Sequence, residues 1–361
     1  MLFKIYPLDT LFFRDSRPFS KGVDSWANGI FPPAPSVFYG ALRSAHFSHH
    51  IDELDKANED GDPTKNLKIK GIFFRVGESD YLPLPYDLVK KKKSSKKEVF
   101  PLIHKDISDY FHSGKTSHIL TTDEDITEAV ETVKSGLIEN GDLNSYLKNE
   151  YNGSKKYNYH ELSEFVSNEP KIGIARNNYS HSTEEGMLYR VGMNRLDNFS
   201  FVIDFNGLGL PHKGFIKIGG EGKGASYELI DDLMEIQKPD FADTDKFFKL
   251  YISTPAIFNN GWIPDWINPE KLEGIVPDTN CRVRLLTAAL SKPLHLGGFD
   301  IKKRQPKPMK KAVGNGSVYY FEVIEGNIKK IVDEIHGKSI SDEEMNKKQG
   351  FGISFIGRIK F

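Results

Sequence analysis

Two glycine-rich loops constrain this chain more than any other feature of its sequence. The first spans residues 219–224 (GGEGKG), and the second spans residues 350–357 (GFGISFIG). Glycine has no Cβ, so it adopts positive φ at little cost and lets backbone N–H groups approach a phosphate closely. Because basic residues accompany the loops, we expect them to hold a phosphate backbone, and nucleic acid is the first partner to consider. The expected contacts are Gly219, Gly220, Gly222, Lys223, Gly350 and Gly352.

A third motif lies near the N-terminus, from Asp9 to Phe19 (DTLFFRDSRPF), and is followed by 31–36 (FPPAPS). Basic and aromatic side chains alternate in it, which suits single-stranded RNA, since charges meet phosphates while rings stack on bases. The alternative is structural: the phenylalanines anchor the loop and the arginines pair with Asp9 and Asp15. The candidate RNA contacts in this region are Arg14, Arg17, Lys21 and, on the helix expected next, Arg43.

Composition limits the class of protein. The 361 residues exceed one typical domain, so two domains are the first expectation. With 49 basic and 50 acidic residues the net charge is −1, so an RNA site must come from local segregation of charge. The single Cys281 excludes an internal disulfide and a thiolate metal cluster. No run approaches the roughly 18 apolar residues of a membrane span, so we expect a cytoplasmic protein without cofactor or membrane contact.

The C-terminal third shows the order βαββαβ of a split βαβ, or ferredoxin-like, unit. Strands are expected at 247–253, 281–290, 317–324 and 352–360, with a helix at 326–336 and a short helix within 255–273. In the N-terminal half, a strand at 2–8, a helix at 36–50 and a strand at 69–76 could begin a second copy.

Residues 85–170 interrupt this pattern. They contain a lysine run at 90–97 and an acidic run at 123–125, and their periodicity is weak. We therefore expect an insertion that is partly helical and partly mobile. Strand-like runs return at 171–176, 187–193, 199–205, 214–219 and 225–230. The prediction is an α+β protein with two ferredoxin-like domains: 1–235, with the insertion at about 85–170, and 245–361.

These motifs resemble a known family. The 9–19 run, the 31–36 run leading into Gly40–Arg43, and the GGEGK of 219–223 are similar to one subunit family of the RAMP superfamily, the third subunit of the type III-B (Cmr) CRISPR effector complex. The loop at 350–357 resembles the glycine loop of the whole superfamily. The resemblance touches residues 1–45, 171–224 and 281–361. The family usually has arginine where this chain has Lys223, so the charge is kept and the bidentate fork is lost.

The resemblance implies a double ferredoxin-like fold and a non-catalytic subunit that holds the 5′ handle of CRISPR RNA (crRNA). It also implies two protein partners, the large polymerase/cyclase-like subunit and a neighbouring RAMP backbone subunit. Phe258, Trp262 and Trp266 lie in a proline- and glycine-rich segment, where exposed aromatics often mark interfaces. The alternative is that these tryptophans anchor the core.

Other basic and titratable groups have two interpretations each. Lys302, Lys303 and Arg304 open a basic stretch between two expected strands, which is either a solvated loop or an RNA or partner contact. Arg176 is a further candidate RNA contact. Because Tyr179 and His181 lie near it in the sequence, the alternative function is a metal-independent endoribonuclease that processes CRISPR RNA, although no pattern here fixes a nucleophile–base pair. His46 and His50 share a helical face, but no third ligand has a supporting motif, so no metal site is predicted.

Overall fold

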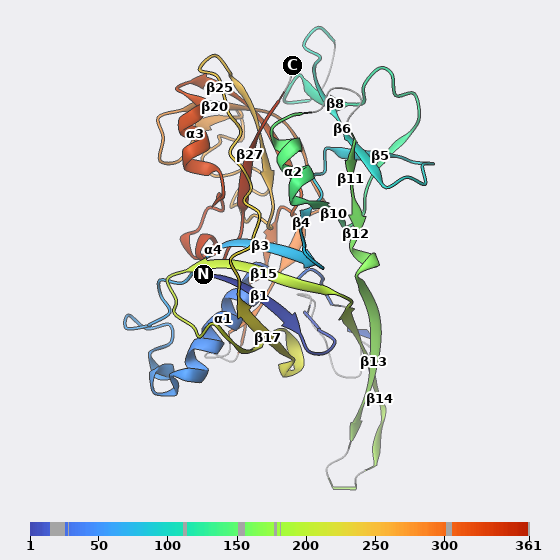
Figure 1. Cartoon of the computed structure of the whole chain (residues 1–361), viewed down its shortest axis with the longest axis vertical. Helices are drawn as coiled ribbons and strands as arrows, with labels where there is room; N and C mark the ends of the chain where they lie inside the picture. Colours follow the sequence, from blue (N-terminus) through green and yellow to red (C-terminus); the bar gives the residue numbers. More distant parts are fainter. Residues whose placement is uncertain are drawn as a thin grey trace.

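The structure, a computed structural model, is organised around two antiparallel sheets (Figure 1). It describes residues 1–14, 26–27, 29–110, 114–150, 156–176, 179–180, 182–300 and 305–359. For residues 26–27, 175–176, 183–189 and 299–300 it describes the backbone alone. Strands account for 42% and helices for 15% of the chain, which confirms an α+β protein.

The first sheet has eight strands in the order β12-β10-β4-β3-β15-β1-β17-β16. Four neighbours form its centre: β3 (Lys68–Val76), β15 (Phe199–Asn206), β1 (Leu2–Pro7) and β17 (Gly224–Leu229). When these four strands are numbered by their order in the chain, their order in the sheet is 2-3-1-4. Helix α1 (Pro35–His49) lies in the chain between the first, β1, and the second, β3. The strands predicted at 2–8, 69–76, 199–205 and 225–230 and the helix predicted at 36–50 are confirmed.

The second sheet has six strands in the order β19-β20-β25-β18-β27-β26. Its four central strands, β20 (Arg282–Ala289), β25 (Val318–Glu325), β18 (Phe247–Ile252) and β27 (Ile353–Arg358), again stand 2-3-1-4 in chain order. Helix α3 (Ile328–Ile335) follows β25 and is capped by Asn327, whose side chain accepts a 2.8 Å hydrogen bond from the Lys329 N–H. These four strands and this helix match the predicted ones to within two residues.

Each four-strand set lacks a helix at one of the two connections where a βαββαβ unit has one. In the first set, β16 (Lys213–Lys217) and its turn stand between β15 and β17. In the second, residues 253–281 are all described and contain no helix, so the short helix predicted within 255–273 is wrong. Pro255, Pro264 and Pro269 interrupt the segment, and proline both removes a backbone donor and blocks the preceding helical turn.

The region expected as a partly helical insertion is mainly short strands. Within the described part of this region, the one α-helix is α2 (Asn140–Leu147). Strands of two to four residues are too short for an alternating pattern to be visible in the sequence, which is why they were missed. The five-residue β4 (Ser79–Pro83) precedes the region and joins the first sheet. The strands within the region are β5 (Leu88–Lys91), β6 (Glu98–Pro101), β7 (Ile103–Asp106), β8 (His118–Thr121), β9 (Val130–Thr132), β10 (Gly136–Glu139), β11 (Tyr157–Asn158) and β12 (His160–Glu161).

A long hairpin projects from the body of the molecule (Figure 1). It consists of β13 (Val166–Arg176) and β14 (Thr183–Leu196), and β2 (Trp26–Ala27) pairs in parallel with β14. Leu11 and Asn194 exchange two backbone hydrogen bonds of 2.8 and 2.7 Å, so the base of the hairpin is attached to the N-terminal motif. The remaining short elements are β19 (Glu273–Ile275), β21 (Leu294–Leu296), β22 (Phe299–Asp300), β23 (Gln305–Pro306), β24 (Lys310–Ala312), β26 (Lys338–Ser339) and α4 (Glu344–Lys348).

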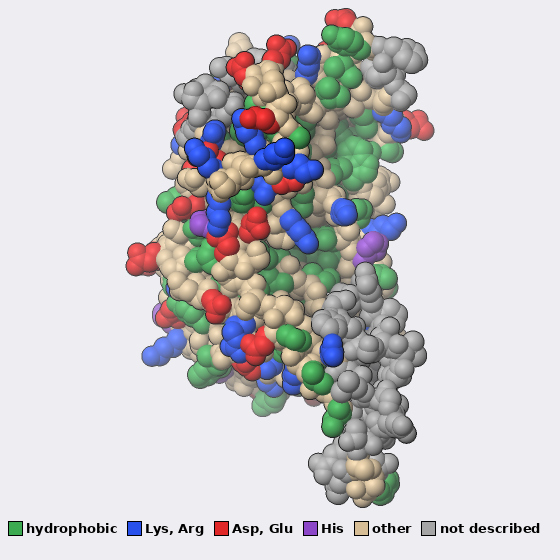
Figure 2. Space-filling view, turned by 90° about the vertical axis from the view of Figure 1, so that its right-hand side faces the viewer, with side chains coloured by type: hydrophobic (Ala, Val, Ile, Leu, Met, Phe, Trp, Pro, Cys, Tyr) green, Lys and Arg blue, Asp and Glu red, His purple; other side chains and the backbone are tan. Residues whose placement is uncertain are grey.

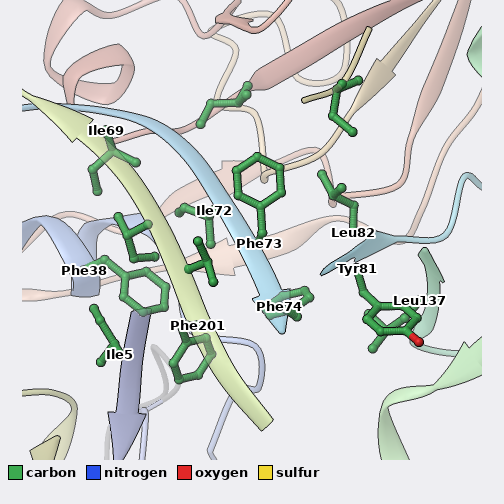
Figure 3. Packing of buried hydrophobic residues seen from close by; sticks show 14 of the residues in the cluster. Ile5, Phe38, Ile69, Ile72, Phe73, Phe74, Tyr81, Leu82, Leu137 and Phe201 are labelled. Atoms are coloured by element: carbon green, nitrogen blue, oxygen red, sulfur yellow. The ribbon is translucent and has the colours of Figure 1, made fainter. Parts of the chain in front are cut away.

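The main hydrophobic core lies between α1 and one face of the first sheet (Figure 3). Ile5 of β1 and Phe201 of β15 are fully buried on this face, and Phe38 of α1 meets the Phe201 ring edge-on, with 5.0 Å between centroids. The same cluster includes Tyr251 and Val318 from the second sheet, so it extends across both sheets, while a second cluster packs the second sheet against α3. Among the described residues, no helix is both long and apolar enough to cross a membrane.

A buried carboxylate joins the two sheets. Asp87, between β4 and β5, is fully buried and accepts hydrogen bonds from the hydroxyls of Tyr146 on α2 (2.7 and 2.8 Å) and Tyr320 on β25 (2.5 Å). Lys249 of β18 is also buried, and its Nζ lies 3.3 Å from the centroid of the Tyr146 ring. Burial lowers the pKa of Lys249 to about 8, an effect that the charge of Asp87 partly offsets.

We predict that Asp87→Ala lowers the free energy of unfolding by about 3–5 kcal/mol, because it leaves two tyrosine hydroxyls and an ammonium buried without their carboxylate. Urea unfolding measures this loss. The matched control Tyr320→Phe removes one hydroxyl and should cost only about 1 kcal/mol. Equal losses for the two variants would contradict the central role of Asp87.

We also predict that Lys249 makes stability rise with pH. Its pKa in the unfolded chain is about 10.4, so above about pH 8 the unfolded state keeps a proton that the folded state has lost. The free energy of unfolding therefore increases with pH in this window. Lys249→Met should remove about 2 kcal/mol of that increase between about pH 8 and 9.5. The measurement is urea unfolding of the wild type and of Lys249→Met across this pH range. Parallel pH profiles of the free energy of unfolding would contradict the prediction.

Candidate nucleic-acid interface

The strand order brings the N-terminal motif and the first glycine loop together. Strands β1 and β17 are antiparallel neighbours, with Pro7 opposite Ala225, so the residues after β1 must meet those before β17. The Gly220 N–H donates a 2.7 Å hydrogen bond to the Phe12 carbonyl oxygen, and the Lys223 ammonium pairs with the Asp9 carboxylate. Two motifs about two hundred residues apart in sequence thus form one site, which we call the motif–loop site.

The glycine loop is the turn of the β16–β17 hairpin. Gly219, Glu221 and Gly222 have φ values of 79°, 58° and 64°, so the turn uses three positive φ angles, as a tight hairpin requires. The carboxylate of Glu221 points away from a phosphate role, because it pairs with Lys171 of β13 at 2.7 Å. The loop therefore also braces the projecting hairpin.

In the N-terminal motif, the described aromatic rings are buried and the described arginine is exposed. Phe12 and Phe13 are buried, so they anchor the loop, as the structural alternative held. Arg14 is exposed and forms a backbone bridge to Gly29. The hydrogen bond from Lys223, followed by that from the Thr10 N–H, lowers the pKa of Asp9. Arg17, Lys21, Asp15 and Phe19 lie outside the described residues.

Arg43 holds a neighbouring loop. Its guanidinium donates to Asp62 (2.6 Å), Thr64 (2.7 Å) and Asn58 (3.0 Å). The Asp62 carboxylate also accepts from the backbone N–H groups of Asn58 and Thr64, so the loop is closed around one ion pair. The structure thus gives Arg43 a bracing position within its own chain rather than an open one.

The C-terminal glycine loop lies inside the molecule. Gly350 and Gly352 are buried, with φ values of 86° and 74°. Their N–H groups, expected to meet phosphate, donate instead to the carbonyl oxygens of Lys347 (3.0 Å) and Pro255 (2.8 Å). A Cβ at Gly350 would lie 2.7 Å from Ile69 Cγ2, so glycine is needed here for close packing of the second sheet's loop on β3.

The remaining basic candidates are only partly described. Lys302, Lys303, Arg304 and His181 lie outside the described residues, and Arg176 ends β13 with its backbone alone described. Beyond them, Lys310 begins strand β24, which pairs with β21, and its ammonium lies 2.5 Å from Glu343. Part of the stretch expected as a projecting loop is therefore a short hairpin.

The three candidate interface aromatics differ in exposure. Phe258 is buried in the second sheet's core, and Trp266 stacks on Phe321 with 5.6 Å between centroids. Trp262 is 41% exposed and stacks on Tyr319 at 6.3 Å. Phe258 is therefore a core residue, and the half-buried Trp266 follows the alternative of core anchoring, whereas Trp262 is the most exposed of the three.

The histidine pair on α1 has an acidic neighbour. The rings of His46 and His50 are 4.6 Å apart, and His46 Nε2 lies 3.4 Å from Glu53 Oε2. Within the described ranges, no group of three or more histidine, cysteine, aspartate or glutamate side chains is placed to hold a metal ion.

Comparison with known proteins decides the family. The family of CRISPR-associated proteins described as Cas_Cmr3 matches residues 3–359. This chain belongs to the Cas_Cmr3 family. The resemblance inferred from the motif at 9–19 and the loop at 219–223 is thereby confirmed. A search of the curated proteins found no match.

The fold of this Cas_Cmr3 family member is similar to that of solved chains. One comes from the cryo-EM structure of the Type III-B Cmr-beta bound to cognate target RNA, with a TM-score of 0.53 and 17% identity. Another comes from the Type III-B Cmr-beta bound to cognate target RNA and AMPPnP, with a TM-score of 0.52 and 16% identity. Each alignment covers 92% of this chain and 88% of the other.

Two contacts of the motif–loop site were not predicted from the sequence, the Asp9–Lys223 and Lys171–Glu221 pairs. The Asp9–Lys223 contact could have been predicted from the expected strand order. In a βαββαβ unit with strand order 2-3-1-4, the first and last strands are antiparallel neighbours, so a motif after strand one meets a loop before strand four. The Lys171–Glu221 contact could not have been predicted, because no sequence pattern gives the direction in which a long hairpin projects.

We predict that Gly219→Ala destabilises the fold more than Gly222→Ala. Both positions have positive φ, which costs a non-glycine residue about 1 kcal/mol. A Cβ at Gly219 would also lie 2.7 Å from the Phe12 carbonyl oxygen, whereas none of the surrounding atoms comes within 4 Å of one at Gly222. Urea unfolding should show an extra loss of about 1–3 kcal/mol for Gly219→Ala. Similar losses would mean that the loop does not press on the N-terminal motif.

Proposed function

We propose that this chain is a non-catalytic, RNA-binding scaffold subunit of a type III-B CRISPR ribonucleoprotein, which holds the crRNA 5′ handle. The observation that carries the proposal is the motif–loop site. The two motifs that resemble the Cmr subunit family meet through the Gly220–Phe12 hydrogen bond and the Lys223–Asp9 ion pair. Family membership and the similar Cmr-beta chains support the same assembly.

The charges of this site divide into two groups. Lys223 and Lys171 are paired with Asp9 and Glu221, so they position the loop and carry little net charge. Arg14 is exposed and follows Phe13 in the N-terminal motif, which the loop contacts through Phe12. Arg14, with Arg17 and Lys21, is therefore the proposed phosphate-binding group, since arginine matches phosphate geometry.

The overall charge supports local rather than global attraction of RNA. The net charge is −1, and Figure 2 shows acidic and basic side chains interspersed on the face it displays. A partner RNA would thus be held where a few cations converge, and its affinity would depend on neighbouring subunits that complete the site.

The same proposal covers domains and protein partners. The two 2-3-1-4 strand sets support two ferredoxin-like domains, at 1–235 and 245–361, although one hydrophobic core runs through both sheets. The proposed protein partners are the large polymerase/cyclase-like subunit and a neighbouring RAMP backbone subunit. Trp262, with its exposed ring, is the candidate contact for the large subunit.

Affinity purification from the native host tests the assembly. We expect the large polymerase-like subunit and repeat-tagged guide RNA to be recovered together with this chain. Recovery of the protein without guide RNA would contradict the scaffold function. Incubation of the purified chain with repeat RNA in EDTA tests for a metal-independent nuclease, and cleavage at one position would contradict a non-catalytic role.

We predict that Arg14→Ala combined with Arg17→Ala weakens RNA binding and flattens its salt dependence. Each lost phosphate contact should reduce the slope of log K against log salt by about 0.7 for a single strand. Titration of labelled RNA at several salt concentrations measures the slope. The control Arg282→Ala with Arg284→Ala removes the same charge from β20, where both arginines pair with Glu273, and should leave the slope unchanged. An unchanged slope in the Arg14/Arg17 variant would remove these residues from the site.

A further inference from the structure

The edge strand β16 exposes an aromatic ring between two lysines. Lys213, Phe215 and Lys217 alternate with Gly214 and Ile216, and Phe215 is 74% exposed. Ile216 is buried in the core that packs against α1. Because successive side chains of a strand point to opposite faces, the three exposed residues lie on the outer face of the first sheet.

The sheet register extends this pattern over three strands. Phe215 is opposite Ser226 of β17, and Ser226 is opposite Tyr6 of β1. The next row runs from Lys213 through Glu228 to Lys4, and a third runs from Lys217 to Gly224, whose carbonyl accepts a 3.1 Å hydrogen bond from the Leu8 N–H. We call this surface the outer-face grid; its residues are Lys4, Tyr6, Leu8, Lys213, Phe215, Lys217, Gly224, Ser226 and Glu228.

The rest of the outer face is covered by the chain itself. After β17, residues 230–246 cross β15 and β3 toward the second sheet (Figure 1). The buried Arg75 guanidinium anchors this crossing by pairing with Asp232 (2.8 Å) and Asp80 (2.7 Å). Val202 of β15, next to Lys4, is fully buried as a result. The crossing segment thus leaves the outer-face grid uncovered at the edge of the first sheet.

The chemistry of the grid suits an unpaired nucleotide. It carries three lysines and one carboxylate, Glu228, which accepts a 2.9 Å hydrogen bond from the Tyr6 hydroxyl. The small Ser226 separates Phe215 from Tyr6, and adjacent strands are about 4.8 Å apart, so the two rings rise from positions about 10 Å apart. That spacing leaves room for a planar base beside the exposed Phe215 ring, while lysines on both sides can meet phosphates.

The grid is continuous with the motif–loop site, since Lys217 is two residues before Gly219 and Leu8 precedes Asp9. We propose that the outer-face grid binds unpaired nucleotides of single-stranded RNA by stacking on Phe215, with phosphates held by Lys213 and Lys217. This inference rests on the proposed function, because it extends the RNA path from the glycine loop onto the open sheet face.

A fluorescent base tests the stacking directly. The full chain is titrated with a single-stranded RNA of about twelve nucleotides that carries 2-aminopurine, reading anisotropy for affinity and quenching for stacking. Phe215→Leu should weaken binding at least about fivefold and abolish the Phe215-dependent quenching. Phe215→Trp should retain both. The control Tyr110→Leu changes another exposed ring, 64% exposed, and should change neither.

The lysines are tested by salt dependence. Lys213→Ala and Lys217→Ala should each reduce the log–log salt slope by about 0.7. Unchanged affinity and quenching in Phe215→Leu, with wild-type binding intact, would overturn the grid and leave the proposed function standing. No RNA binding by the wild-type chain alone would also overturn the grid as a site of this chain, whereas the proposed function, whose site neighbouring subunits complete, is tested by the affinity purification. Unchanged RNA binding in Phe215→Leu with reduced recovery of the large subunit would show that this face contacts protein, which also overturns the proposal.

Discussion

The carboxylate of Asp87 lies where the two sheets meet, and its buried charge must be satisfied by groups from the insertion and from the second sheet. Tyr146 belongs to the insertion, whereas Tyr320 and Lys249 belong to the second sheet. Removing a buried charge from its partners costs far more free energy than an exposed ion pair contributes. The Asp87 network therefore strongly disfavours separation of the two sheets. The insertion is consequently part of the core rather than an appendage to it.

This arrangement has a consequence for the motif–loop site. The first sheet reaches the Asp87 network through β4, which pairs with β3 and precedes Asp87 in the chain. The order 2-3-1-4 then keeps β1 next to β17, and the N-terminal motif stays against the glycine loop. A rigid scaffold of this kind positions loops for binding without requiring a basic surface overall.

Within the site, paired and exposed cations have different tasks. The Lys223–Asp9 and Lys171–Glu221 pairs fix the loop to the N-terminal motif and to the projecting hairpin. Arg14 and Lys217 are exposed, and they are the groups proposed to bind phosphate. This division explains how a chain of net charge −1 can carry a proposed RNA site, since the attraction depends on a few local charges.

Local sequence patterns were sufficient for the long strands, α1, α3 and the family, because such strands, amphipathic helices and the glycine motifs carry patterns that do not depend on tertiary context. They did not determine that Phe12 and Phe258 are buried, that Gly350 donates its N–H within the chain, or that Phe215 is exposed. Those outcomes depend on which distant segments cover each position. Only the tertiary structure decided them, because burial and hydrogen-bond satisfaction are set by long-range packing rather than by local spacing.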